Sequence, residues 1–228
     1  MRRVLNVIRL QMINRQTFIW VPLIILAGAT LLSVLIYAMI PVETPKYGGG
    51  GQAPLWYFFA IGISAMSLTF PFSQAMSITR REFFLGTMLT AVLASTFLGV
   101  VFLIGGGIEI ATNGWGVNGY VFYLPWMWEA GALGAWTVYF TLALFLFVVG
   151  FTGATIYKSW GVTVLTIVWI ALALVLVGLV FLVTRLNMWI EVGHTIGNLG
   201  ALGLALWGLL LTAIFMAVSF IAFRRTIP

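Results

Sequence analysis

Residues 78–84, Ile-Thr-Arg-Arg-Glu-Phe-Phe, place three consecutive charged side chains between two long apolar runs. Only 7% of the 228 residues are charged, so such a cluster is unusual in this chain. It separates residues 55–78 from residues 84–108, and each run exceeds the roughly 20 residues that a helix needs to cross a bilayer. We interpret the stretch as a tight polar turn between two membrane-spanning helices.

The composition supports a membrane protein. The chain is 62% hydrophobic and lacks Asp, and its mean hydropathy is +1.12, values outside the range of soluble globular domains. The sequence therefore predicts an all-α membrane protein with a single transmembrane domain over residues 1–228. The six predicted transmembrane helices cover residues 18–40, 55–78, 84–108, 133–157, 160–183 and 200–222.

The segment 1–17 precedes the first of these helices and carries both apolar and basic residues. On a helix, one arc holds Val4, Leu5, Ile8 and Met12, and the opposite arc holds Arg2, Asn6 and Arg9. This pattern is typical of an amphipathic helix that lies on the inner leaflet of a membrane. A disordered basic tail is the alternative. The apolar run continues to Ile40, well beyond a signal-peptide core, so we expect an uncleaved first span.

The positive charges predict the orientation, because cytoplasmic flanks carry an excess of Lys and Arg. Six spans place both termini on one side, and nine of the eleven basic residues fall on that side: Arg2, Arg3, Arg9, Arg15, Arg80, Arg81, Lys158, Arg224 and Arg225. Both termini are therefore predicted to be cytoplasmic. Membrane lipid accounts for the basic character of the chain without a nucleic-acid partner.

The outer connections contain turn-forming and aromatic residues. Residues 41–52 contain two prolines and four glycines, and we expect a loop without regular structure. The later connections, about 109–132 and 184–199, contain Trp115, Trp126, Trp128 and Trp189, which suit an interfacial aromatic belt. Glu109 is expected at the interface as well, because an acid at mid-membrane costs about 2.5–3.5 kcal/mol.

The charged stretch has two interpretations. Thr79 and Glu82 have the spacing of a capping box, which would begin the third helix. Alternatively, Arg80 and Arg81 together with exposed Phe83 and Phe84 would form a cationic and aromatic knob that docks onto another protein, since Arg and aromatic residues dominate binding hot spots. The residue types fit both interpretations.

The motif Thr-Arg-Arg-Glu-Phe-Phe-Leu-Gly-Thr at 79–87 resembles the cytoplasmic turn after the second span in membrane permease subunits of the type-2 ABC exporter family. The layout of the whole chain is similar as well. The resemblance implies a permease that forms a homodimer or a heterodimer with a similar permease in a bacterial plasma membrane. It also implies two ABC ATPase subunits as partners, with Thr79, Arg80, Arg81, Glu82, Phe83 and Phe84 as the ATPase-coupling helix.

Further roles follow from the same resemblance. Arg9 and Arg15 become possible ATPase contacts, and Arg185, Glu191 and His194 fall in an outer hairpin between the last two spans. The chain lacks a GxxxxGK[ST] loop. We therefore expect no cofactor on this chain, with ATP and Mg bound through the partner subunit. We expect no enzymatic activity and no metal site in the chain itself.

Two smaller patterns occur near the last span. Gly193, Gly197, Ala201 and Ala205 recur every four residues, as in close helix packing in lipid. Packing against the fifth span and a dimer contact are both possible. Glu191 and His194 are three residues apart and could form a hydrogen bond on a helix, although a solvated loop also fits them.

The leading functional hypothesis is a permease that exports a drug, peptide or lipid, because no predicted span has a charged residue at its centre. An ion- or proton-coupled secondary transporter is the alternative, with Pro71 as the best candidate for a broken helix. A single His194 and the absence of Cys argue against a membrane-embedded enzyme. A non-transporting scaffold or immunity subunit would have the same sequence features as the exporter.

Overall fold

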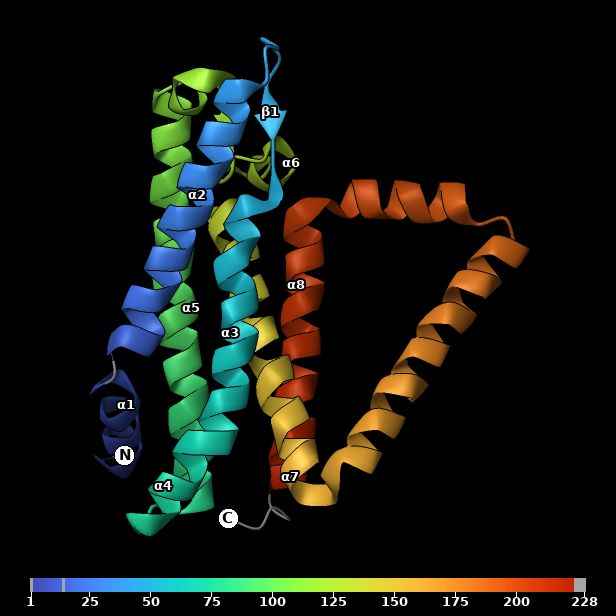
Figure 1. Ribbon diagram of the computed structural model, residues 1–228. Helices are drawn as coiled ribbons and strands as arrows, with labels where there is room; N and C mark the ends of the chain where they lie inside the picture. Colours follow the sequence, from blue (N-terminus) through green and yellow to red (C-terminus); the bar gives the residue numbers. More distant parts are fainter. Residues whose placement is uncertain (1, 14, 224–228) are drawn as a thin grey trace.

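The computed structural model describes residues 2–13 and 15–223, which form a bundle of long helices (Figure 1). The helices are α1 (Arg2–Ile13), α2 (Val21–Met39), α3 (Ala53–Ser64), α4 (Phe70–Ala75), α5 (Arg80–Ala111), α6 (Pro125–Trp128), α7 (Gly131–Arg185) and α8 (Trp189–Phe223). Shorter helical turns cover Gln16–Trp20, Gly49–Gln52, Ala65–Thr69 and Gly114–Asn118. The strands β1 (Lys46–Tyr47) and β2 (Gly119–Tyr120) pair in parallel.

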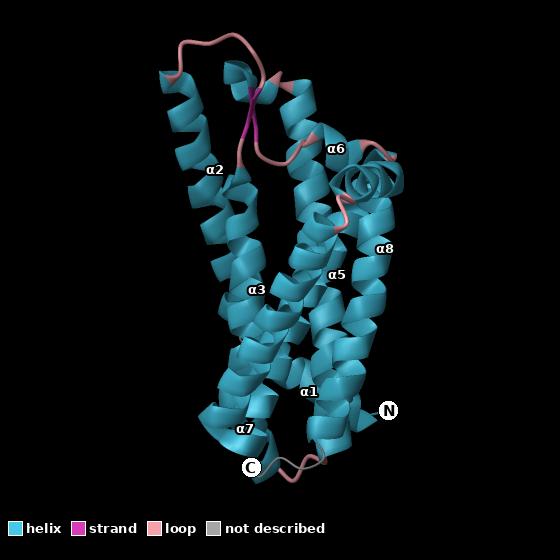
Figure 2. Ribbon diagram, turned by 90° about the vertical axis from the view of Figure 1, so that its right-hand side faces the viewer, coloured by secondary structure: helices cyan, strands magenta, loops and turns pink. Residues whose placement is uncertain are grey.

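Five continuous helical stretches are long and apolar enough to cross a membrane, which confirms the predicted all-α membrane protein. They are Gln16–Met39, Gly49–Ala75, Arg80–Ala111, Gly131–Arg185 and Trp189–Phe223. Two of them change direction at a glycine with positive φ, α7 at Gly161 and α8 at Gly200. Such backbone conformations favour glycine because it has no Cβ. Residues 162–185 consequently lean away from the bundle, and residues 189–199 run from the tip of this arm back to the rest of α8, roughly at right angles to it (Figure 1). Figure 2 shows the bundle from the side of this arm.

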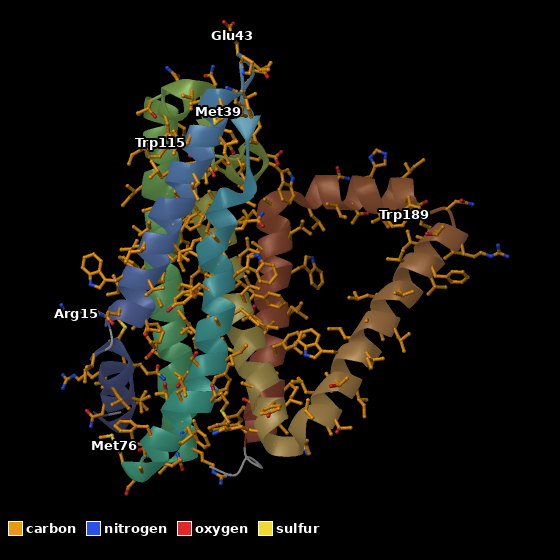
Figure 3. The ribbon with its side chains drawn as sticks, in the orientation of Figure 1. Arg15, Met39, Glu43, Met76, Trp115 and Trp189 are labelled. Carbon is orange, nitrogen blue, oxygen red and sulfur yellow. The ribbon has the colours of Figure 1, made fainter. Side chains whose placement is uncertain are left out.

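The bundle has two distinct ends. We call the turn between α4 and α5 the elbow. The elbow end of the bundle contains this turn, α1 and the last turn of α8, whereas the strand end contains β1, β2 and the turn after α5 (Figure 1). Met76 lies at the elbow end, and Met39, Glu43 and Trp115 lie at the strand end (Figure 3). Of the predicted cytoplasmic basic residues, Arg224 and Arg225 lie outside the described residues, as do the side chains of Arg2 and Arg3.

The backbones of α3 and the first part of α7 come into close contact. A Cβ at Gly62 would meet the carbonyl oxygen of Phe147, and a Cβ at Gly150 would meet the carbonyl oxygen of Phe59. Each glycine thus lets the backbone of one helix touch that of the other, as small residues do between helices in lipid. This contact brings the second long helix beside α7 and forms the centre of the bundle.

The predicted boundaries differ from the structure in several places for local reasons. The predicted loop 41–52 contains β1 and a 3₁₀ turn, because Lys46 and Tyr47 pair with β2. The predicted break between spans 133–157 and 160–183 lies close to the change of direction at Gly161, which divides α7 into two helical parts. The predicted 1–17 segment ends early, because α1 stops at Ile13 and the first long helix begins at Gln16. The predicted start of the last span at residue 200 coincides with the change of direction at Gly200, although residues 189–199, predicted as a connection, are helical as well.

The small residues Gly193, Gly197, Ala201 and Ala205 do not share one helix face, because α8 changes direction at Gly200. Gly193 and Gly197 have no neighbouring atom where a Cβ would lie. Ala201 and Ala205 are buried against Val138 in the first part of α7. The predicted packing of these residues against the fifth span, 160–183, was therefore wrong, because the two alanines face the part of α7 that precedes Gly161.

We expect Gly150→Ala to destabilise the fold by about 1–3 kcal/mol, because the added methyl group forces α3 and α7 apart. Gly153→Ala is the matched control, since Gly153 has open space at its Cβ position; there, alanine is neutral or favours the helix by up to about 1 kcal/mol. Thermal unfolding of both variants in detergent would measure the difference. Equal unfolding midpoints would contradict the inferred backbone contact.

Candidate functional site

The elbow between α4 and α5 is formed by fewer residues than the sequence indicated. The reversal occupies Met76–Thr79, where Ser77 adopts a φ of 57°. The Glu82 amide donates to Thr79 Oγ1 at 3.3 Å, and the Thr79 amide donates to Glu82 Oε2 at 3.1 Å. These bonds confirm the predicted capping box. Arg80, Arg81 and Glu82 therefore belong to the first turn of α5, and the expectation that they form the turn itself was wrong.

Phe83 and Phe84 are buried, so the prediction of two exposed phenylalanines was wrong. Once Thr79 caps the helix at Arg80, the fourth and fifth residues of α5 point into the bundle. They belong to the elbow cluster, which we define by its six rings: Phe70, Phe83, Phe84, Phe151, Phe220 and Phe223. Neighbouring ring centroids in this cluster lie 4.8–6.1 Å apart, within the usual range for favourable aromatic pairs.

The elbow cluster joins four parts of the chain. Phe83 and Phe84 begin α5, Phe70 belongs to α4, Phe151 lies on the first part of α7, and Phe220 and Phe223 lie at the end of α8. The Lys158 ammonium lies 5.5 Å from the centroid of Phe70, a cation–π contact at the edge of the cluster. Any displacement of the first turn of α5 must therefore move or repack residues from three other helices.

Helix α1 packs beside this elbow. The buried Gln11 side chain donates from Nε2 to Thr87 Oγ1 at 2.8 Å, and a Cβ at Gly86 would lie 2.6 Å from the Val7 side chain. Between α1 and the elbow lies a groove of about 590 Å³, lined by Asn6, Arg9, Leu10, Ile13, Met76, Ser77 and Ile78. The structure thus brings predicted contact residue Arg9 next to the elbow.

The remaining predicted site residues lie elsewhere. Arg15 is exposed at the junction of α1 with the first long helix, outside the groove (Figure 3). Arg185, Glu191 and His194 are exposed on the arm that leads from α7 into α8. In the described part of the chain, no hydrogen bond joins Glu191 to His194. Residues 189–199 form one helix that lies beside the bundle and connects the arm to the rest of α8 (Figure 1).

The sequence interpretation missed the role of Glu109, whose side chain is fully buried at the end of α5. Its Oε1 accepts from the Trp115 indole at 2.9 Å and the Val121 amide at 2.8 Å. Its Oε2 accepts from the Phe122 and Tyr123 amides at 2.8 and 2.7 Å. These N–H donors replace water around the carboxylate. The only signal in the sequence was an acid at the end of an apolar run, followed by a glycine-rich segment.

More hydrogen bonds tie the strand end together. The Phe122 carbonyl accepts from the Tyr139 hydroxyl at 2.6 Å and from the Trp128 indole at 3.0 Å. Lys46 Nζ donates to the carbonyl oxygens of Tyr37 at 2.9 Å and Val117 at 3.2 Å. The indoles of Trp115 and Trp128 are therefore bonded within the protein. Of the predicted aromatic belt, Trp126 and Trp189 are the exposed members.

A metal centre finds no support in the described residues, where no group of three His, Asp or Glu side chains could hold an ion. Comparisons with protein-family models, curated proteins and solved structures found no match for this chain. The geometry of the elbow and of the strand end is therefore the basis for proposing a function.

We expect Thr79→Ala to loosen the start of α5 by about 1 kcal/mol, because the Glu82 amide loses its side-chain acceptor. Thr79→Ser keeps the hydroxyl and is the matched control. Hydrogen exchange of the amides in the first turn of α5 would measure the change. Unaltered exchange in the alanine variant would show that the capping box adds nothing to local stability.

We expect Glu109→Gln to destabilise the fold by at least about 2 kcal/mol. In either orientation, the amide NH₂ would face two N–H donors, and each buried donor that loses its acceptor costs about 1–3 kcal/mol. Exposed Glu191→Gln is the control, with no change expected. Thermal unfolding compares the two variants, and similar midpoints would argue against an organising role for Glu109.

Proposed function

We propose that this chain is the transmembrane permease subunit of an ATP-driven ABC exporter, which moves an amphipathic or lipid-like substrate such as a drug, peptide or lipid. Energy would come from two separate ATPase subunits, and a second permease, identical or similar, would complete the transport path. The proposal places the chain in a bacterial plasma membrane with both termini in the cytoplasm. The observation that carries it is the elbow cluster.

The elbow has the properties that a coupling element requires. Its backbone reversal is short and capped, so little flexible chain can absorb a push from outside. Phe83 and Phe84 then connect the first turn of α5 to residues on α4, α7 and α8. Packed cores shift between discrete arrangements and do not deform continuously. A partner that moves the elbow would therefore move several helices together.

The adjoining groove supplies a surface for the ATPase. Arg9 lines its wall, and Arg81 is exposed on the first turn of α5. Ile13 and Met76 expose apolar side chains in the same groove, with 77% and 55% of their surface accessible. Arginine beside apolar surface is typical of protein–protein binding sites. We therefore propose that the ATPase contacts both α1 and the elbow.

Six membrane passes are compatible with the five long helices. At about 1.5 Å per residue, the parts of α7 on either side of Gly161 are about 45 and 36 Å long, and each exceeds the hydrocarbon thickness of about 30 Å. Lys158 and Trp160 lie beside the reversal, where interfacial residues are expected. We propose that α7 contributes the fourth and fifth passes, and that its second part contacts the second permease.

The proposal can be tested by purifying the tagged chain without crosslinker and identifying the ATPase that accompanies it. We expect Arg81→Glu to reduce transport per ATP hydrolysed in the reconstituted complex, because it reverses a charge on the coupling turn. Glu43→Lys, which reverses a charge on an exposed residue at the strand end, is the matched control. A chain that purifies alone and transports substrate on a proton gradient would favour the secondary transporter instead.

A further inference from the structure

We propose that this chain holds one acyl chain of a membrane phospholipid inside the strand-end half of its bundle. The site lies between α3, the first part of α7 and the second part of α8. It is contained within a single subunit and needs neither an ATPase nor a second permease. The inference therefore goes beyond the proposed export function and is independent of it.

Two apolar cavities form the site. The first, of about 380 Å³, lies against Leu55, Phe102, Val121 and Leu146. The second, of about 300 Å³, lies against Val138, Ala201, Ala205 and Leu211. Both volumes fall within or at the edge of the range of ligand pockets in proteins, roughly 300–1,000 Å³.

The cavities lie on either side of a shared wall. Met127, Leu142 and Phe145 line both of them. Methionine is flexible and adapts readily to neighbouring shapes, so Met127 can move aside without disturbing a helix. An elongated ligand can thus occupy both cavities, whereas a compact one would fit a single cavity.

The extent of the site matches one leaflet. On α8, the lining residues run from Ala201 to Leu211, which at 1.5 Å per residue is a rise of about 15 Å. This is half of the hydrocarbon thickness of about 30 Å. The cavities also begin at the strand end, because Gly49 and Gly51 of the first outer connection line the first cavity.

The chemistry of the walls favours a hydrocarbon chain without its head group. None of the described residues that line either cavity carries a charge, so a phosphate would have no partner inside. The Tyr139 hydroxyl is already bonded to the Phe122 carbonyl. Trp56 and Trp126 line the cavities and are 62% and 46% exposed, which marks lateral edges through which a lipid tail can enter from the bilayer.

The test uses the purified full chain in vesicles that contain phosphatidylglycerol with a diazirine midway along one acyl chain. After illumination, mass spectrometry maps the labelled peptides. We expect label on the segments that contain Met127 and Leu142 to exceed label on residues 162–185, which are exposed almost throughout in the single chain. Equal labelling of the two regions would indicate only the surrounding lipid and would overturn the proposal.

Cavity-filling variants provide the second arm. We expect Leu142→Trp to reduce cavity labelling about tenfold, which corresponds to about 1.4 kcal/mol of binding free energy, because the larger indole would occupy space at the wall that the two cavities share. Leu133→Trp, on the exposed surface of the same helix, leaves labelling unchanged. Ala205→Leu fills the second cavity from α8 and decides the question if Leu142→Trp does not fold. Undiminished labelling in a folded cavity-filling variant would overturn the proposal.

Discussion

A chain that enters lipid must satisfy its buried polar groups from within, because hydrocarbon offers no hydrogen bonds. Glu109 is the most demanding case, since its carboxylate is fully buried. Three of its donors are the consecutive amides of Val121, Phe122 and Tyr123. The acid therefore fixes the path of the segment after α5. That path places Val121 and Met127 in the walls of the strand-end cavities, so the cavity depends on the buried charge.

The need to satisfy polar groups within the protein also determines the structure of the elbow. A helix start leaves backbone N–H groups without partners, and Thr79 and Glu82 satisfy them within the turn. The cap thereby sets where α5 begins, and the start of α5 determines that Phe83 and Phe84 point inward. The capping-box interpretation is therefore confirmed, whereas the exposed aromatic residues of the other interpretation are not found. The capping box is the reason that the aromatic residues join the core and leave the arginines at the surface.

Composition and apolar run lengths were sufficient to predict the helical membrane fold, since these properties follow directly from lipid as a solvent. The changes of direction at Gly161 and Gly200 were not predictable, because glycine also occurs inside apolar helices at Gly150 and Gly178, where the backbone stays helical. The capping box could be predicted because its partners are three residues apart. The hydrogen-bond donors to Glu109 could not be predicted, because they follow it by six to fourteen residues through an irregular segment.

The two ends of the bundle consequently differ in how they respond to force. At the strand end, Lys46, Glu109 and Tyr139 hold the connecting segments with directional hydrogen bonds of 2.6–3.2 Å, which weaken steeply when their geometry is disturbed. At the elbow end, the rings are held by dispersion and burial, which have no fixed direction, so the rings can repack into another discrete arrangement. A push on the elbow would therefore repack the aromatic cluster before it broke the strand-end network. The helices would tilt about the strand end, and the two apolar cavities, which lie near that end, would change least in shape.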